Sequence, residues 1–201
     1  MSHRSLRSSL IVTAALLLVG VGSAGCLGPS VDDSGPTACA ADEFEANDTQ
    51  QTARDLGRLQ DDPDSARGVT ATVHHGKDVD WYRVHVSDTG LGGDPNVAVT
   101  VPQGYSVTTW FVCDGGRVVD KMCLQGSSEY MTVEGIEGCR GSVPDSFTDQ
   151  NGNTVYPSDV VAASTTDCSG TSDDDGTLYI RVERSSSSST ACTYDLSIAV
   201  D

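Results

Sequence analysis

The sequence has few basic residues, and lysine is the scarcest of them. Only two of its 201 residues are lysines, Lys77 and Lys121, and 12 basic residues stand against 29 acidic ones. Such an excess of negative charge argues against electrostatic binding to nucleic acid or to anionic lipid headgroups, and it favours cations as ligands. Aspartate outnumbers glutamate by 23 to 6, a bias of salt-adapted proteins and of calcium-loaded extracellular proteins. Composition does not separate these two interpretations.

Catalytic motifs are also missing. The chain has no G-x-S-x-G, no H-E-x-x-H and no C-x-x-C pattern that would frame a nucleophile or a zinc site. After the first 25 residues the histidines are His74, His75 and His85. The first two end a predicted strand, where surface exposure is expected and a metal-binding pair is the alternative. We therefore predict that the protein is not an enzyme and has no catalytic residue.

The longest apolar run, residues 10–21, is too short to cross a bilayer, which takes about 20 residues. Two arginines precede it and small residues follow it, a pattern typical of a secretory signal peptide. The small residues at 23–25 and the following Cys26 resemble a bacterial lipoprotein signal. This resemblance implies that residues 1–25 are removed and that Cys26 is acylated, so that the membrane is a partner through the lipid anchor.

The residues after the anchor predict a tether and one domain. Residues 26–38 are rich in Gly, Pro, Ser and Asp, as expected of a flexible linker. Leu27, in place of Asp, favours the outer membrane or cell surface over the inner membrane, by analogy with enterobacteria. The 176 residues that follow the signal contain 10 basic and 29 acidic residues, a formal charge of −19, and suit a single domain at 39–201.

Six cysteines remain once Cys26 is assigned to lipid. An even number in an exported chain predicts three disulfide bonds, while their pairing stays open. The six are Cys39, Cys113, Cys123, Cys139, Cys168 and Cys192.

Most of the domain alternates apolar and polar residues with a period of two. This pattern predicts an all-β fold, an antiparallel β-sandwich or jelly roll of about seven or eight strands. One short helix is expected near residues 49–56, capped by Asn47 or Asp48 and ended by Gly57. Residues 125–176 predict a long polar insertion held by its cysteines and available for specific contacts. Residues 185–189, a serine run, predict a hairpin loop. The alternating segments are residues 69–73, 82–86, 97–101, 107–111, 178–182 and 194–200.

Two acidic segments carry a family resemblance. Residues 42–49 read DEFEANDT and residues 77–82 read KDVDWY, with Ala53 and a Leu-Gly pair at 56–57 between them. Together they resemble the bacterial pre-peptidase C-terminal domain, a β-sandwich family that includes the collagen-binding domains of clostridial collagenases. The resemblance implies calcium held between the two segments. The implied ligands are Glu43, Glu45, Asn47, Asp48, Asp78 and Asp80.

A structural alternative exists for each of these residues. In it Asp48 caps the short helix, Glu43 and Glu45 face water, and Asp78 and Asp80 only begin a strand. Calcium chemistry remains sensible, because calcium takes six to eight oxygen ligands and gathered carboxylates would otherwise repel one another.

Aromatic side chains offer a second kind of surface. Trp81 and Trp110 fall on the strand faces opposite the valine rows, and Tyr130 lies in the polar insertion. An exposed row of this kind would bind glycan or peptide, while burial in the sandwich is the alternative.

The sequence thus predicts a lipid-anchored binding or structural module of the cell envelope, with an extracellular polymer or a partner protein as ligand. The alternative is an accessory to a secreted hydrolase, or a small version of one.

Overall fold

The computed structural model describes residues 39–62, 65–88, 94–124, 127, 129–133, 136–144, 147–148, 152–155, 157–169, 174–185 and 191–201. The chain separates into two compact units, Met1–Asp32 and Asp33–Asp201, and every described residue belongs to the second. The predicted signal peptide, Cys26 and the predicted tether lie outside the described residues. Among the described residues, no helix is long and apolar enough to span a membrane.

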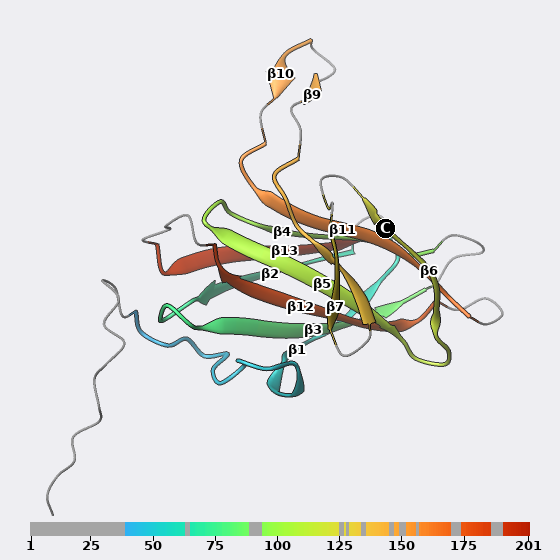
Figure 1. The fold of residues 1–201 in the computed structure, drawn as a ribbon, viewed down its shortest axis with the longest axis horizontal. Helices are drawn as coiled ribbons and strands as arrows, with labels where there is room; N and C mark the ends of the chain where they lie inside the picture. Colours follow the sequence, from blue (N-terminus) through green and yellow to red (C-terminus); the bar gives the residue numbers. More distant parts are fainter. Residues whose placement is uncertain are drawn as a thin grey trace, which may run out of the picture. The chain divides into compact units, whose positions relative to one another are not determined.

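Two β-sheets share one hydrophobic core (Figure 1). The six-stranded sheet contains, in spatial order, β1 (Arg54–Gln60), β3 (Val79–Ser87), β12 (Gly176–Arg184), β5 (Tyr105–Cys113), β8 (Ile136–Arg140) and β7 (Glu129–Val133). The five-stranded sheet contains β2 (Ser65–Thr72), β13 (Thr193–Val200), β4 (Asn96–Val101), β11 (Val160–Cys168) and β6 (Val118–Leu124). Strands β9 (Phe147–Thr148) and β10 (Thr154–Val155) form a separate hairpin. Only the edge pair β1–β3 is parallel among these pairings.

The period-two pattern builds the core. On β13 every second residue is buried, so that Leu196 and Ile198 face inward while their neighbours face out. Val84 and Val86 on β3 do the same from the opposite sheet and join the same cluster. The all-β, disulfide-linked sandwich predicted from the sequence is confirmed.

The predicted helix is a single 3₁₀ turn, Gln50–Thr52. It begins after Thr49 because the hydroxyls of Thr49 and Thr52 each accept the other residue's backbone N–H. The chain then enters β1, where Gly57, with φ of 87°, sits at a shift in the β1–β3 register. Glycine is needed there for the bulge and does not end a helix.

The predicted polar insertion contains strands β7 to β11 and adds to the expected strand number. Strand β11 is interior to the five-stranded sheet, between β4 and β6. Its inward row includes Ala162, Ser164 and Thr166, all nearly fully buried. Because the side chains on its buried face are small or carry hydroxyl groups, this strand does not show the alternation of apolar and polar residues that predicted the others.

Strands β12 and β13 lie in opposite sheets, so the prediction of a hairpin at 185–189 is wrong. Strand β12 pairs with β3 and β5, whereas β13 pairs with β2 and β4. Two adjacent amphipathic strands satisfy the same pattern whether they pair or face each other across a core.

The three predicted disulfides form as Cys39–Cys192, Cys113–Cys168 and Cys123–Cys139. The second joins β5 to β11 and the third joins β6 to β8, so both connect one sheet to the other. Beside the third, Lys121 on β6 donates its Nζ proton to the carbonyl oxygen of Glu137 on β8. Covalent and polar contacts therefore hold the two sheets together at β6.

Removing each disulfide by a double Cys→Ser exchange should destabilise the domain in order of the chain length that it closes. The separations are 153 residues for Cys39–Cys192, 55 for Cys113–Cys168 and 16 for Cys123–Cys139. Loop-closure entropy gives costs of about 5, 4 and 3 kcal/mol, respectively. Equilibrium denaturation of the three variants measures the order, and a reversed order would contradict it.

Lys121 should make the stability of the domain depend on pH at the alkaline end. Burial lowers the pKa of its ammonium from 10.5 to about 8, against the opposing effect of the Glu137 carboxylate. Between these two values the unfolded chain binds more protons than the folded one, so stability should rise with pH by at most about 3 kcal/mol. Denaturation from pH 7 to 10 should show this rise in wild type and in the exposed-lysine control Lys77→Met. A rise that persists in Lys121→Met would refute this origin.

Candidate metal centre at the N-terminal segment

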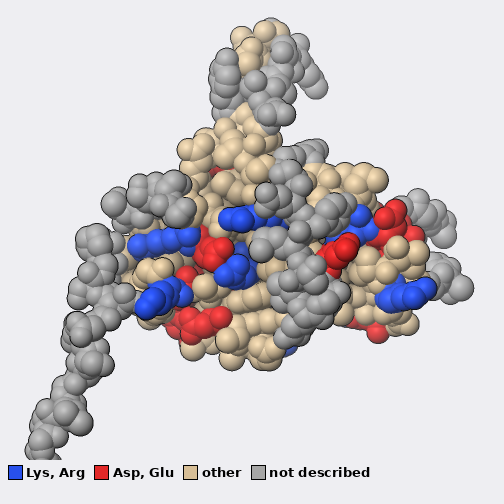
Figure 2. All heavy atoms as spheres, viewed as in Figure 1, with Lys and Arg blue, Asp and Glu red and all other residues tan. Residues whose placement is uncertain are grey.

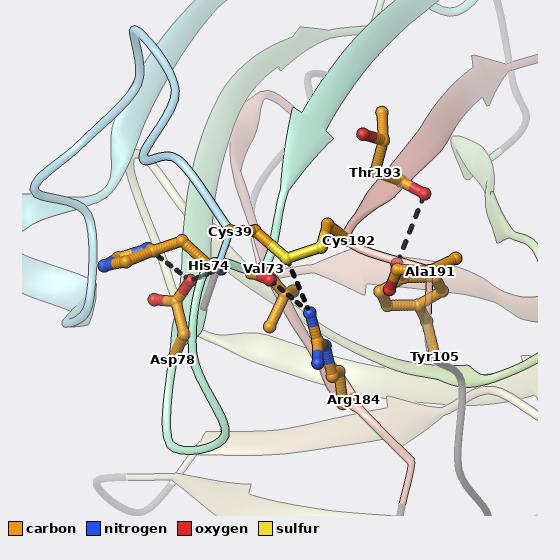
Figure 3. The surroundings of a disulfide bond; sticks show 9 residues. All are labelled: Cys39, Val73, His74, Asp78, Tyr105, Arg184, Ala191, Cys192 and Thr193. Atoms are coloured by element: carbon orange, nitrogen blue, oxygen red, sulfur yellow. Dashed lines mark hydrogen bonds and ion pairs between the residues drawn. A yellow bond between two sulfur atoms is a disulfide. The ribbon is translucent and has the colours of Figure 1, made fainter. Parts of the chain in front are cut away.

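The N-terminal segment, residues 39–49, is fixed against the connection between β2 and β3. Cys39 is disulfide-bonded to Cys192, and its backbone N–H donates to the carbonyl of His74 at 2.9 Å. Beside this disulfide, the guanidinium of Arg184 donates to the carbonyl of Val73 at 2.6 Å (Figure 3). The segment is thereby anchored before its acidic residues begin.

Asp42 turns the segment toward the sandwich. Its carboxylate accepts the backbone N–H of Phe44 at 2.8 Å and that of Thr72, in β2, at 2.6 Å. Phe44 packs edge-on against Tyr82, with ring centroids 6.0 Å apart. At its far end the segment is held by Asn47, whose carbonyl accepts the N–H of Trp81 at 2.8 Å.

Between these anchors, Glu45 meets His74 and Asp78. The Nδ1 atom of His74 lies 2.8 Å from Glu45 Oε1 and 2.7 Å from Asp78 Oδ2. The Asp78 side chain is completely buried and that of Glu45 is 13% exposed. Asp78 Oδ2 also accepts the backbone N–H of His74 at 2.5 Å, which holds the carboxylate in place (Figure 3).

Several buried polar atoms at this place have no hydrogen-bond partner. Within the described part of the chain six buried side-chain atoms are in this state. Four of them belong to this cluster, namely Glu45 Oε1, Asn47 Oδ1, His74 Nδ1 and Asp78 Oδ1. The short approaches of His74 to the two carboxylates therefore lack hydrogen-bond geometry. Buried groups left in this way are costly, at about 1–3 kcal/mol each.

Two more side chains complete the cluster. Asp48 offers a carboxylate oxygen that groups within 4.8 Å with those of Glu45 and Asp78. His75 offers a ring nitrogen that groups in the same way with His74 and Asp78. Asp48 is exposed and free to do this because Thr49 caps the 3₁₀ turn in its place.

The electrostatics of the cluster favour a cation. Burial raises the pKa of Glu45, and the nearby carboxylate of Asp78 raises it further. His74 opposes this effect in part. A positive ion among these groups would offset the repulsion between the carboxylates and the cost of removing them from water.

Asp80 serves a different network, inside the sandwich. Tyr194 on β13 donates its hydroxyl proton to Asp80 Oδ2 at 2.7 Å, and the hydroxyls of Tyr194 and Tyr82 are 2.8 Å apart. Burial raises the pKa of Asp80 to about 7, with a smaller contribution from Asp78. This network connects the two sheets through β3 and β13.

The structure thus brings together three of the six oxygen ligands implied by the family resemblance: Glu45, Asp48 and Asp78. Asn47 adjoins them through its backbone N–H, which donates to Glu45 Oε2, while its side-chain nitrogen donates to the carbonyl of Trp81. Glu43 is exposed, and Asp80 is bound to Tyr194. For His74 the sequence favoured surface exposure and gave a metal-binding pair with His75 as the alternative, but it did not predict the contact with Glu45.

Of the two interpretations of the tryptophans, the structure shows burial and not an exposed ligand surface. Trp81 is 7% and Trp110 2% exposed, and their rings stack with centroids 5.1 Å apart and an interplanar angle of 19°. They form a second small core with Ala53, on the face of the six-stranded sheet away from the main core. The side chain of Tyr130 lies outside the described residues.

One serine, histidine and aspartate line up elsewhere on the chain. His85 Nε2 lies 2.8 Å from Asp114 Oδ2, and His85 Nδ1 lies 3.4 Å from Ser87 Oγ. Ser87 is only 6% exposed, and its hydroxyl oxygen already accepts a hydrogen bond from Arg58 at 2.7 Å. A serine held in this way is not presented to a substrate.

A pocket of about 560 Å³ lies between β5 and β6, lined by residues that include Phe111, Arg117 and Lys121. Strand register places Cys113 beside Gly176, which pairs with Val86. The pocket is therefore at the opposite end of β3 from the cluster of Glu45, His74 and Asp78 and shares no residue with it.

Charges on the surface are mixed in sign. Figure 2 shows basic and acidic side chains interspersed on the face drawn in Figure 1. Among the described residues, Arg181 pairs with Glu183 at 2.6 Å and Arg83 pairs with Asp55 at 3.2 Å. On this face the acidity of the chain does not create a field of one sign.

Comparison with known proteins gives weak structural similarities. No protein-family model and no curated protein sequence matches this chain. CorA, a surface-associated copper-binding protein important in copper acquisition by Methylomicrobium album BG8, is similar at a TM-score of 0.32 and 11% identity, over 74% of this chain and 100% of that one. The pre-peptidase C-terminal domain of a Bacillus anthracis collagenase is similar at a TM-score of 0.20 and 12% identity, over 65% of this chain and 94% of that one. Both similarities concern the course of the chain alone.

Proposed function

We propose that this protein is an exported, lipid-anchored β-sandwich of the bacterial cell envelope whose N-terminal segment is clamped by a divalent cation. It acts as a binding or structural module for an extracellular polymer or a partner protein. The observation that carries the clamp is the convergence of buried, unpartnered atoms of Glu45, His74 and Asp78 between the segment and the β2–β3 connection. Calcium is the ion that the family resemblance implies.

The chemistry of the donor set supports a cation. Carboxylate and amide oxygens from Glu45, Asn47, Asp48 and Asp78 are of the kind that calcium takes. The carboxylates reach the cluster from two segments that are about thirty residues apart in sequence. An ion bound by both segments would stabilise only the docked arrangement, so binding and docking would be linked.

The disulfide at Cys39 has a mechanical consequence for an anchored protein. The predicted tether, residues 26–38, ends at Cys39, where the clamped segment begins. Pull on the lipid anchor would thus pass through the Cys39–Cys192 disulfide to β13, which begins at Thr193, and would largely bypass the clamped segment. A domain held in this way is suited to being displayed at a surface.

The proposal gives the protein no enzymatic activity. The alternative is a secreted hydrolase or an accessory to one, and Ser87, His85 and Asp114 are a described set that could serve as the catalytic residues of a hydrolase. The burial of Ser87 and its hydrogen bond from Arg58 oppose that role.

Cation binding should raise the melting temperature of the chelator-treated protein, because the ion binds the docked segment only. Calcium added at about 100 times its dissociation constant should add about 2.7 kcal/mol of stability. Asp78→Asn should abolish most of this gain, since it removes a buried ligand charge and keeps the shape of the side chain. Glu43→Gln, the same loss of charge at an exposed residue outside the cluster, is the control and should keep the gain.

Glu45→Gln provides a second test in case Asp78→Asn does not fold. Melting curves with and without chelator measure the gain in all variants. If wild type melts at the same temperature with chelator, calcium, zinc and copper, the clamp is refuted.

Lipid anchoring should depend on Cys26. In a bacterial host that processes lipoproteins, the wild-type chain should partition with the membrane fraction, and intact-mass spectrometry should show acyl chains on residue 26 as the first residue. Cys26→Ser should release the protein, because stable anchoring needs more than one acyl chain. An unmodified Cys26 in the wild-type protein would refute the anchor and leave the clamp untouched.

A further inference from the structure

The cluster at the N-terminal segment contains an imidazole as well as carboxylates. His74 ends the β2 side of the connection, and its ring turns toward the docked segment, not toward open solvent, so that its side chain is 24% exposed. The ring nitrogen Nδ1 is buried and has no hydrogen-bond partner, although it lies within 2.8 Å of carboxylate oxygens on two different segments. A nitrogen in this position is a ligand of the centre in its own right.

A nitrogen ligand changes which cation the centre prefers. Calcium is bound by oxygen atoms, whereas imidazole suits copper, zinc, nickel and iron. Carboxylates accept both classes of ion, so Glu45 and Asp78 do not decide between them. The imidazole of His74 does decide between them, because its Nδ1 atom lies next to both carboxylates and would be a ligand of an ion bound by them.

The spacing of the donor atoms fits one shared ion. Nδ1 of His74 is 2.8 Å from Glu45 Oε1 and 2.7 Å from Asp78 Oδ2. These are the ion-pair distances of a protonated His74, and the same two carboxylates can surround a cation together with the neutral imidazole. For a given set of nitrogen and oxygen ligands, affinity among the first-row divalent ions is highest for Cu(II).

The burial of Asp78 is a second, independent observation that points to a ligand at this site. Asp78 is 2% exposed as a residue, and its Oδ1 atom is buried without a partner while Oδ2 is fixed by the backbone N–H of His74. His75 stands beside His74, with ring centroids 4.4 Å apart, and provides a second imidazole within the same group. Buried oxygen, buried nitrogen and a neighbouring imidazole are thus gathered at one corner of the sandwich.

We propose that the centre is a mixed nitrogen and oxygen site for a first-row transition cation of the Cu(II) type, with His74, Glu45 and Asp78 as ligands, and that it binds this ion in preference to calcium. This inference rests on the proposed clamp and identifies its ion. The domain would then hold or carry a transition metal at the cell surface, in addition to being stabilised by it.

The experiment is a titration of the mature, acylated protein, which begins at Cys26, in detergent, without a histidine tag and after treatment with chelator. Cu(II) should bind at least about 100-fold more tightly than Ca(II), in line with the preference of imidazole ligands. His74→Gln should weaken Cu(II) binding by more than the roughly 10–100-fold cost of losing an outer-shell partner, and it should leave Ca(II) binding within about threefold, because only the nitrogen ligand is lost. His85→Gln, which changes a histidine paired with Asp114 outside the cluster, should bind like wild type.

A spectroscopic measurement on wild type keeps the test decisive if His74→Gln does not fold. Electron paramagnetic resonance of the Cu(II) protein at one equivalent should show coupling to imidazole nitrogen. Absence of nitrogen coupling, or calcium binding as tight as copper binding, would overturn the transition-metal assignment while the clamp stands. Failure of every divalent cation to bind would overturn both.

Discussion

The docking of the N-terminal segment onto the sandwich buries two carboxylates, those of Glu45 and Asp78, against the same imidazole. This contact is the constraint on which the rest of the corner depends. Removing carboxylates from water is costly unless charge and hydrogen bonds compensate. Here the backbone N–H of His74 donates to one oxygen of Asp78 and that of Asn47 donates to Glu45 Oε2, whereas Asp78 Oδ1 has no hydrogen-bond partner. A bound cation, as proposed, would compensate this oxygen and the charge of both carboxylates together.

The corner does not depend on the ion for its outline. The Cys39–Cys192 disulfide fixes one end of the segment, the two backbone N–H groups bound by Asp42 fix its turn, and the carbonyl of Asn47 fixes its far end to β3. These contacts place the ligands before any ion arrives, so little ordering entropy is left to lose on binding. The sandwich adds rigidity beneath them, because Tyr82 packs against Phe44 from the core side of β3.

The sequence predicted well those features that the residues of a single strand determine by themselves. Alternating apolar residues predicted the core rows of β3, β4 and β13, and six cysteines predicted three disulfides. Features that depend on a second strand were missed. Strand β11 buries Ser164 and Thr166 between two neighbours, so it lacked an apolar signature. The tryptophans on the outer face pack with Ala53, which no sequence pattern in β3 or β5 predicts.

The candidate site was likewise predicted only in part. The motif pointed to Glu45, Asn47, Asp48 and Asp78, while His74 entered the cluster only through the course of the β2–β3 connection.

The two aspartates of the D-x-D motif show how one pattern yields two roles. Residues two apart on a strand point to the same face, so Asp78 and Asp80 both point toward the core side of β3. Asp78 precedes the strand and stands at the rim, where it meets the docked segment, whereas Asp80 lies within the sandwich and accepts a hydrogen bond from Tyr194 on the opposite sheet. Burial raises the pKa of Asp80 to about 7, so near neutral pH this carboxyl adds less than a full charge to the corner. The negative charge that a bound ion would balance therefore comes chiefly from Glu45, Asp48 and Asp78. Of the two aspartates of the motif, Asp78 is the proposed ligand at the rim, whereas Asp80 takes part in the hydrogen bond to Tyr194 inside the sandwich.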